Sequence, residues 1–405
     1  MFRFLTAGES HGQALTVIIE GLPAGLPISS EDIDKDLIRR QGGYGRGDRM
    51  KIERDHAEVL SGVRHGLTIG SPIAMLIRNR DWVNWQSRMS PTPVAEPGEP
   101  VTRLRPGHAD LPGALKYGFQ DVRNVLERAS ARETAARVAA GAVARQFLDQ
   151  FGIKVASFTL SIAAIEAQVD EEIDWEKVER SPVRCPDAKA EQLMIEAIDA
   201  ARAAGDTVGG VFEVRAMGVP IGLGSHVHWD RRLDGLVAQA LMSIQAVKAV
   251  EIGLGLGVAS HRGSAVHDVI QYTTPPRGVG TGAAKESSPW HHLSNRAGGI
   301  VGGMSNGEPI VARAAVKPIP TLAKPLPSVD LLTGESVIAH FERSDVCVVP
   351  AAGVVGEAML AIVLADAFLA KFGGDSLGET ARSYRAYMDE IRCAREQSSI
   401  PASAE

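Results

Sequence analysis

Cysteine is scarce in this chain and shows no bridging pattern. The 405 residues include three cysteines, Cys185, Cys347 and Cys393, which are far apart, odd in number and without a Cys-x-x-Cys pair. A disulfide framework and a cysteine-based zinc site are therefore excluded, and this usage is typical of a reducing compartment.

Long apolar segments and an excess of basic charge are also missing. The longest apolar tract, from Val346 to Ala370, is interrupted by Pro350, Glu357 and Asp366, which argues against a membrane span. The start lacks the basic and apolar segments of a signal peptide, so we expect a cytoplasmic protein. The net charge of −6 gives no general basic surface for nucleic acid, and arginines gathered at a few points favour local anion sites instead.

Nucleotide-binding loops of the common kinds are absent. The glycine runs 253–257 and 278–282 lack the third-glycine spacing of a dinucleotide loop, and no Gly-x-x-x-x-Gly-Lys-Ser/Thr segment occurs. The His226/His228 and His291/His292 pairs have no carboxylate pattern beside them, so we expect no metal site. Glycine is abundant, at 42 residues, which indicates many turns and close backbone contacts.

The apolar patterns predict a protein of strands and buried helices. Two strands are expected within residues 1–28, and Ser29 or Ser30 then caps a helix that runs to about Gln41. An alanine-rich helix is expected from about Val122 to Gln150, with small residues on several faces, as in a buried helix. We expect further helices at 188–204, 230–251, 356–371 and 377–396, strands within 51–78, 155–162 and 309–316, an acidic linker at 170–176, and loops at 79–104 and 258–297, the last as a possible lid.

Two segments resemble each other faintly. Val17 to Leu26 and Phe212 to Leu223 each predict a strand, then Pro-x-Gly-Leu, then a helix. Shared turn chemistry explains this pattern as well as a duplicated strand–helix unit, which would give the core an approximate twofold symmetry.

The segment Gly8-Glu-Ser-His-Gly12 places an acid, a hydroxyl and an imidazole between two glycines. Glycine on both sides favours a tight turn between strands, and the polar residues make the turn a candidate site. Alone, the segment is equally consistent with a connector and with a site.

Arginines are concentrated in one glycine-rich loop. Arg39, Arg40, Arg46 and Arg49 lie within eleven residues, separated by glycines that would let the loop wrap a small anion. A solvated basic loop remains the alternative.

Further candidate segments lie downstream. Arg105-Pro-Gly-His-Ala-Asp110 fixes a loop histidine that Asp110 could orient, and His11 and His108 are both plausible proton donors near neutral pH. Glu127 to Glu133 opens the alanine-rich helix and could hold phosphate. Asn295 to Gly307 and Lys317 to Thr321 could hold a flat ring and a phosphate, and Arg343-Ser-Asp345 combines an anion ligand with a proton acceptor. Each of these segments also has an ordinary structural interpretation as a helix, a hairpin or an ion pair.

Taken together and in this order, these segments resemble the chorismate synthase family over about residues 1–380, in its bacterial form without an added flavin reductase domain. The resemblance implies an α+β fold: a β-α-β sandwich with internal pseudo-twofold symmetry and central alanine-rich helices between antiparallel sheets. It implies one domain over residues 1–397, followed by a disordered tail at 398–405.

The resemblance also implies the reaction. The family converts 5-enolpyruvylshikimate 3-phosphate to chorismate by an anti 1,4-elimination of phosphate, the last step of the shikimate pathway. It requires reduced FMN although no net redox change occurs, with NADPH involved only through flavin reduction. A homotetramer, supplied by an external flavin reductase, is expected.

Roles for individual residues follow by similarity. His11 would protonate the leaving phosphate, His108 would stabilise the reduced flavin near N1, and Asp345 would relay a proton near flavin N5. The implied substrate-binding residues are Ser10, Arg40, Arg46, Arg49, Arg132 and Arg343. The implied FMN-binding residues are Arg128, Ala129, Ser130, Gln245, Ala246, Gly302, Lys317, Pro318, Ile319, Pro320, Thr321 and Arg343.

Two other classes of function compete with this interpretation. A non-catalytic anion- or flavin-binding protein on the same scaffold would be expected to lack His11, His108 or Asp345, and all three are present. A flavin oxidoreductase that uses NAD(P)H directly is disfavoured by the absence of a dinucleotide loop.

Overall fold

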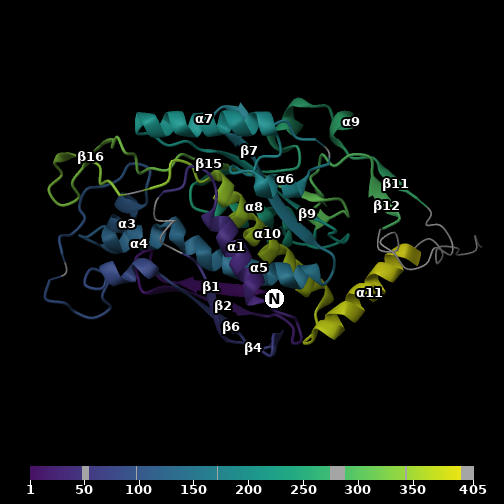
Figure 1. Cartoon of the computed structure of the whole chain (residues 1–405). Coiled ribbons are helices and arrows are strands. Elements are labelled where there is room, and N and C mark those ends of the chain that lie inside the picture. The colour runs from purple at the N-terminus through teal and green to yellow at the C-terminus, as the bar shows by residue number, and fades with distance from the viewer. Residues whose placement is uncertain (48–53, 97, 171, 274–287, 343, 394–405) are drawn as a thin grey trace, which may run out of the picture.

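Two antiparallel sheets with helices between them form the framework of the computed structural model (Figure 1). The structure describes residues 1–47, 54–96, 98–170, 172–273, 288–342 and 344–393. The predicted tail at 398–405, Arg49 and Arg343 lie outside the described residues.

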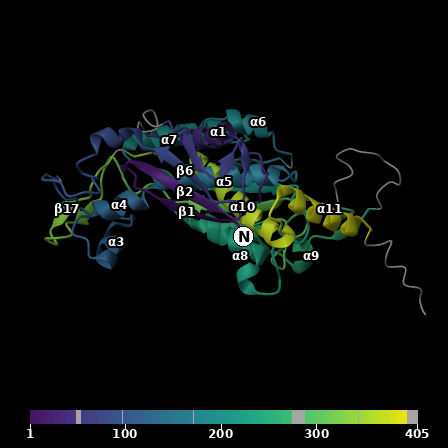
Figure 2. The ribbon, with the colours of Figure 1, turned by 90° about the horizontal axis from the view of Figure 1, so that it is seen from below.

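The first sheet has the strand order β1-β2-β6-β3. It consists of β1 (Arg3–Ala7), β2 (Ala14–Glu20), β6 (Ile73–Arg78) and β3 (Ala57–Ser61). Burial alternates along β2 and β6, so that one face of the sheet, which includes Val17 and Met75, packs on the helices. Figure 2 shows this sheet lying across α5 and α10.

The second sheet has the order β10-β15-β9-β7-β8. Its strands are β10 (Val247–Ile252), β15 (Ile310–Val316), β9 (Gly210–Met217), β7 (Lys154–Ile162) and β8 (Ile165–Glu166). All the strand pairs of this sheet are antiparallel, and it covers the opposite side of the helical layer (Figure 1).

The helical layer contains α1 (Ser30–Gln41), α5 (Thr134–Asp149), α8 (Leu233–Met242) and α10 (Val349–Phe372). Small residues let α5 and α10 pack closely: a Cβ placed on Gly141 would lie 2.3 Å from the Cβ of Ala358. We therefore attribute the alanine and glycine content of these helices to close packing in the core, as the sequence predicted. By length and composition alone α10 could cross a membrane, but 89% of its most apolar window is buried inside this fold.

Shorter elements lie around this framework. At one end of the molecule are α3 (Asp110–Tyr117), α4 (Arg123–Ala129), η1 (Arg80–Asn84) and the hairpin of β16 (Pro327–Val329) and β17 (Ser336–Ile338); α11 (Leu377–Cys393) lies at the other end (Figures 1 and 2). The remaining elements are η2 (Ala131–Glu133), α6 (Trp175–Arg180), α7 (Ala188–Ala204), η3 (Trp229–Arg231), η4 (Gly255–Ser260), α9 (Gly263–Val266), and the hairpins β4 (Val63–Arg64) with β5 (Leu67–Thr68), β11 (Ile270–Tyr272) with β12 (Trp290–His292), and β13 (Ile300–Val301) with β14 (Met304–Ser305).

The predicted helix at 230–251 is wrong in its second half. α8 ends at Met242, Ala246 adopts a positive φ of 70°, and Val247 begins strand β10. The alternating pattern of 247–252 suits a strand, and pairing with β15 completes the edge of the second sheet.

The predicted continuous helix at 122–150 is also divided. α4 ends at Ala129, Ser130 is extended, and α5 begins only at Thr134. Ser130 accepts a hydrogen bond from the backbone N–H of Arg132, which makes it an N-cap in the middle of the predicted helix.

Three predicted loops contain structure, and the one at 79–104 includes η1 (Arg80–Asn84). Asp174, assigned to an acidic linker, caps α6 by accepting from the backbone N–H of Lys177. The predicted loop at 258–297 contains the second half of η4 and all of α9, β11 and β12. The lid prediction falls partly on residues 274–287, outside the described part.

Candidate active site

The turn between β1 and β2 is held in place by its glycine and by a buried asparagine. Gly8 has a φ of 105°, and a Cβ there would lie 2.3 Å from the carbonyl oxygen of Ala14, so only glycine fits. The Nδ2 of Asn79 donates to the carbonyl oxygens of Glu9 and Gly12, at 3.1 and 2.7 Å. The predicted tight turn is confirmed, and it presents Ser10 and His11 in a fixed geometry.

His11 is bound by a buried glutamate. Glu127 of α4 accepts from the backbone N–H of His11 at 2.8 Å, and His11 Nδ1 lies 2.9 Å from Glu127 Oε1. Arg123, one helical turn earlier, donates to the same oxygen at 3.1 Å. The ring of His11 stacks on Trp85, with centroids 3.9 Å apart. These contacts leave Nε2 as the ring nitrogen that Glu127 does not engage.

Ser10 and Ser130 meet beside this histidine. The Ser130 hydroxyl donates to Ser10 Oγ at 3.1 Å, and the backbone N–H of Ser10 donates to the carbonyl oxygen of Glu127 at 3.0 Å. The break between α4 and α5 thus places Ser130 in contact with the turn that carries His11.

Predicted anion ligands gather next to these serines. Arg132 donates to both oxygens of Asp55, at 2.6 and 2.7 Å, and to Asn79 Oδ1 at 2.9 Å. Arg40 lies beside them, with Nη1 3.6 Å from Asp55 Oδ2 and hydrogen bonds from Nε to Thr134 and from Nη2 to a backbone carbonyl.

Arg40 is buried, as Arg132 is, and is in a strongly charged environment. Burial lowers the pKa of Arg40; Asp55 opposes the shift, whereas Arg132 and Arg46 add to it. Its Nη1 has no hydrogen-bond partner among the described residues. A bound anion at this position would offset the cost of burying the positive charge.

Arg46 brings Asp345 to the edge of the same cluster. Arg46 Nη1 lies 3.0 Å from Asp345 Oδ2, and the backbone N–H of Gly47 donates to Asp345 Oδ1 at 2.7 Å. Not every arginine of the predicted anion-binding loop lies in this cluster. Arg39 points away from it and forms a bidentate ion pair with the buried Glu357 of α10.

His108 is held by a different set of contacts. His108 Nδ1 lies 2.5 Å from Asp110 Oδ1, and Arg105 donates from Nε to Asp110 Oδ2 at 2.9 Å. Burial alone would raise the pKa of Asp110, but the hydrogen bonds from His108 and Arg105 outweigh it and hold that pKa well below its usual range. Asp110 is therefore an ionised acceptor, which requires Nδ1 of His108 to carry a proton.

The segment 317–321 lies against the His108 loop. The Lys317 ammonium donates to the carbonyl oxygen of Gly107, and Arg105 Nη1 donates to Thr321 Oγ1 at 3.5 Å. Ile319 and Pro320 are held between these points, with the Ile319 carbonyl accepting from Thr207 at 2.8 Å. Pro318 follows Lys317 directly in this segment.

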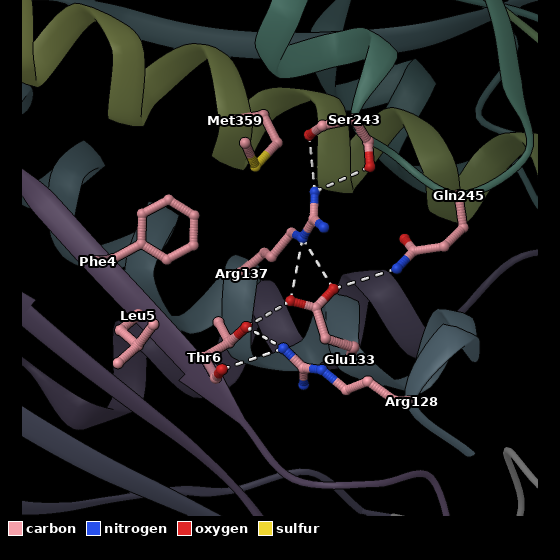
Figure 3. Close-up of a pocket in the computed structure, with 9 residues that line it drawn as sticks. All are labelled: Phe4, Leu5, Thr6, Arg128, Glu133, Arg137, Ser243, Gln245 and Met359. Carbon is pink, nitrogen blue, oxygen red and sulfur yellow. Dashed lines mark hydrogen bonds and ion pairs between the residues drawn. The ribbon is translucent and has the colours of Figure 1, made fainter. Parts of the chain in front are cut away.

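Gln245 and Ala246 connect this segment to Arg128. The Ala246 carbonyl accepts from the backbone N–H of Lys317 at 2.9 Å, and Gln245 donates to Glu133 at 3.2 Å. Gln245 and Arg128 line a hollow of about 370 Å³. Figure 3 shows Arg137 and Glu133, which also line it, joined to each other. Arg128 donates there to the carbonyl oxygens of Thr6 and Gly8, both at 3.0 Å.

One predicted flavin contact is not brought to this region. Gly302 lies in the hairpin of β13 and β14, whose Gly303 carbonyl accepts from the backbone N–H of Leu233 at the start of α8. Gln245 and Ala246 follow the opposite end of that helix. Ala129, the last residue of α4, adjoins Ser130 as predicted.

Several residues of this region were not selected from the sequence. Trp85 and Asn79 contact the predicted residues from positions that are distant in the chain, and no local pattern marks them. Glu127 belongs to a predicted candidate segment, but its contact with His11 was not predicted. Asp55 follows an undescribed segment and pairs with Arg132 at a separation of 77 residues. A signal did exist at Ser130, because Ser-x-x-Glu is a helix-start pattern.

Buried arginines, two carboxylate-bound histidines and serine hydroxyls define an enzyme that handles a small polyanion with proton transfer. Comparison with known proteins identifies the particular family. The chorismate synthase family model matches residues 2–369. Chorismate synthases of Moorella thermoacetica and Geobacter sulfurreducens are each 58% identical over 397 residues, spanning 96% and 97% of this chain and the full length of each relative. A crystal structure of chorismate synthase superposes with a TM-score of 0.76 at 45% identity, covering 96% of this chain and 98% of that one.

The chain belongs to the chorismate synthase family. It is a carbon–oxygen lyase that eliminates phosphate from 5-enolpyruvylshikimate 3-phosphate to form chorismate, the final step of the shikimate pathway. The sequence prediction of family and reaction is confirmed, and both competing classes are set aside. The family uses a reduced flavin.

Proposed function

We propose that His11 donates the proton that the leaving phosphate requires. The observation that carries this role is the engagement of Nδ1 by Glu127, which leaves Nε2 as the ring nitrogen available to a phosphate oxygen. Ser10 lies on the same turn, and its hydroxyl is held by Ser130, so the pair can orient a phosphate oxygen beside His11.

The arginine cluster is our candidate for the substrate anions. Arg40, Arg46 and Arg132 carry three positive charges against the two negative charges of Asp55 and Asp345. A phosphate and carboxylates would complete this charge balance, and the guanidinium groups fix their orientation. Arg49 and Arg343 remain proposed substrate ligands by family resemblance, and Arg343 also a flavin ligand.

The residues proposed to hold FMN fit a flat, anionic cofactor. Burial and the nearby Lys248 both lower the pKa of Lys317, so a phosphate beside Lys317 and Thr321 would be stabilised. Gln245 Oε1 is buried without a hydrogen-bond partner among the described residues, as expected of an amide that awaits a ligand. Reduced FMN would supply transient electron donation to the breaking C–O bond, with no net redox change.

The other proposed FMN ligands are assigned by the resemblance and by their neighbours. His108, in the Asp110-bound tautomer, would stabilise the reduced cofactor near N1, and Asp345 would move a proton near N5. The remaining ligands are Arg128, Ala129, Ser130, Ala246, Gly302, Pro318, Ile319 and Pro320. Gly302 lies apart from them in this chain, so its assignment has the least support.

Broader properties are proposed on the same basis. Support for one domain over 1–397 comes from a main core cluster that runs from Phe2 to Phe372. The pseudo-twofold relation finds support in two matching units, β2 followed by α1 and β9 followed by α8. Three further proposals rest on the family alone. The protein would be a cytoplasmic homotetramer without nucleic-acid or membrane partners. An external reductase would supply the reduced flavin, so NADPH would be needed only indirectly.

An anaerobic assay tests this proposal directly. The purified chain is given 5-enolpyruvylshikimate 3-phosphate and chemically reduced FMN without NADPH, and phosphate and chorismate are measured together. We expect equal amounts of both products. Turnover that requires NADPH as well as reduced FMN would show a built-in flavin reductase and overturn the proposed cofactor supply.

A further inference from the structure

Glu342 lies between two arginines that serve different histidines. Its Oε1 is 3.5 Å from Arg123 Nη1, and its Oε2 is 3.8 Å from Arg105 Nη1. Arg123 is the partner of Glu127, and Arg105 is the partner of Asp110. One carboxylate therefore joins two sites that come from separate parts of the chain.

The contacts form an unbroken series of alternating basic and acidic side chains from one histidine to the other. Each neighbouring pair in the series is within 3.8 Å. The series is His11, Glu127, Arg123, Glu342, Arg105, Asp110 and His108.

Most of this series is shielded from water. The side chains of Glu127 and Asp110 are 0% and 1% exposed, and that of Glu342 is 27% exposed. Charges that are screened so little interact over longer distances than surface charges do. Burial raises the pKa of Glu342, but the hydrogen bond with His340, at 3.3 Å, and then the charges of Arg105 and Arg123 outweigh it and lower that pKa to about 2, so Glu342 is ionised at working pH.

We propose that Glu342 is a positioning residue that couples His11 and His108, favouring the charged form of both histidines and holding Arg123 and Arg105 in line. The catalytic meaning of this coupling rests on the proposed roles of the two histidines. Neither Glu342 nor Glu127 contacts a reacting atom in this assignment; each acts through its neighbours.

The sign of the effect follows from the charges. A negative charge raises the pKa of a nearby histidine, so Glu342→Gln should lower the titration midpoints of both His11 and His108, by about 0.5–1 pH unit. Freed from Glu342, Arg123 and Arg105 would neutralise Glu127 and Asp110 more fully, which acts in the same direction. Of the other nearby groups, His340, whose Nε2 lies 3.3 Å from Glu342 Oε1, loses this carboxylate, whereas Arg88 above Trp85 and Lys317 at Gly107 stay unchanged by the substitution.

Histidine titration in the free protein tests the coupling without requiring catalysis. The protein is labelled with 13C at histidine Cε1, and the signals of His11 and His108 are assigned by their loss in His11→Asn and His108→Asn. Glu335→Gln, at an exposed acid seven positions earlier, is the matched control. We expect both midpoints to fall in Glu342→Gln, to stay in Glu335→Gln, and to fall together by a smaller amount in Glu342→Asp, where the carboxylate is kept but displaced.

Each result decides the proposal. Unchanged midpoints in a folded Glu342→Gln protein, or a shift of one histidine only, would overturn the coupling. Should Glu342→Gln fail to fold, the smaller displacement of the carboxylate in Glu342→Asp must shift both midpoints together or the coupling is wrong. If the coupling is present while His11→Asn retains full turnover, the proposed role of His11 fails and the coupling stands.

Discussion

The two histidine sites reach a similar geometry by different routes. His108 is bound by Asp110, two residues away, and Arg105 completes the set from the same short loop. His11 is bound by Glu127, which is 116 residues away, and is stacked on Trp85 from the excursion after β6. The first site is assembled locally, whereas the second exists only when the first sheet, η1 and α4 are packed together.

This difference predicts how each site responds to damage. A loop that supplies its own carboxylate and arginine keeps its geometry when distant packing loosens, whereas a site built across three elements does not. Both side chains are still mostly buried, at 14% exposed for His11 and 17% for His108, and each imidazole has a carboxylate within hydrogen-bond distance.

The largest effect should come from removing either imidazole. We expect His11→Asn and His108→Asn each to lower turnover by ~10²–10⁴-fold while the fold is retained, because each removes a proposed proton donor or cofactor contact. The anaerobic rate of chorismate formation with reduced FMN measures this loss. His226→Asn, at an exposed loop histidine, should retain full turnover, and wild-type turnover in either site variant would remove that assignment.

The contrast between the sites also explains what could be predicted from sequence. Asp110 could be named as a partner for His108 because the two are neighbours in a Pro-Gly loop, and the hydrogen bond confirms it. Glu127 could not be named as a partner for His11, since nothing in a single sequence relates positions so far apart. Trp85 lies in a polar, proline-rich stretch that was predicted to be only a surface excursion.

Adjacent arginines show a second limit. Arg39 and Arg40 read as one basic pair, but consecutive residues on a helix point about 100° apart. Arg39 consequently reaches Glu357 in the core, and Arg40 reaches Asp55 at the site. The local pattern predicted an anion loop. Tertiary packing decides where each side chain is buried, and it places Arg39 in the structural core and Arg40 in the candidate ligand cluster.

A smaller effect should come from neutralising the carboxylate of the His11 site. Glu127→Gln keeps an acceptor near Nδ1 but loses the negative charge, so the pKa of His11 should fall and turnover at neutral pH should drop by about 10- to 100-fold. The pH–rate profile should then move toward acid, with part of the activity recovered at lower pH. A uniform loss at every pH would instead indicate that Glu127 serves only the packing of α4.

The smallest effect concerns stability at the His108 site. The pKa of Asp110 is depressed in the folded protein, so its contribution to stability is complete above its unfolded pKa of about 4 and is lost as pH falls toward the folded value. This contribution is on the order of 2 kcal/mol. Asp110→Asn should therefore be less stable near neutral pH and should lose less urea resistance between pH 5 and pH 3. Urea unfolding midpoints at each pH measure both effects.

Asp149→Asn, at an exposed ion pair with Lys154, is the control and should keep the wild-type slope. Equal slopes for Asp110→Asn and wild type would mean that ionised Asp110 does not stabilise the folded protein between pH 5 and pH 3. The locally assembled His108 site would then add nothing to the pH dependence of stability.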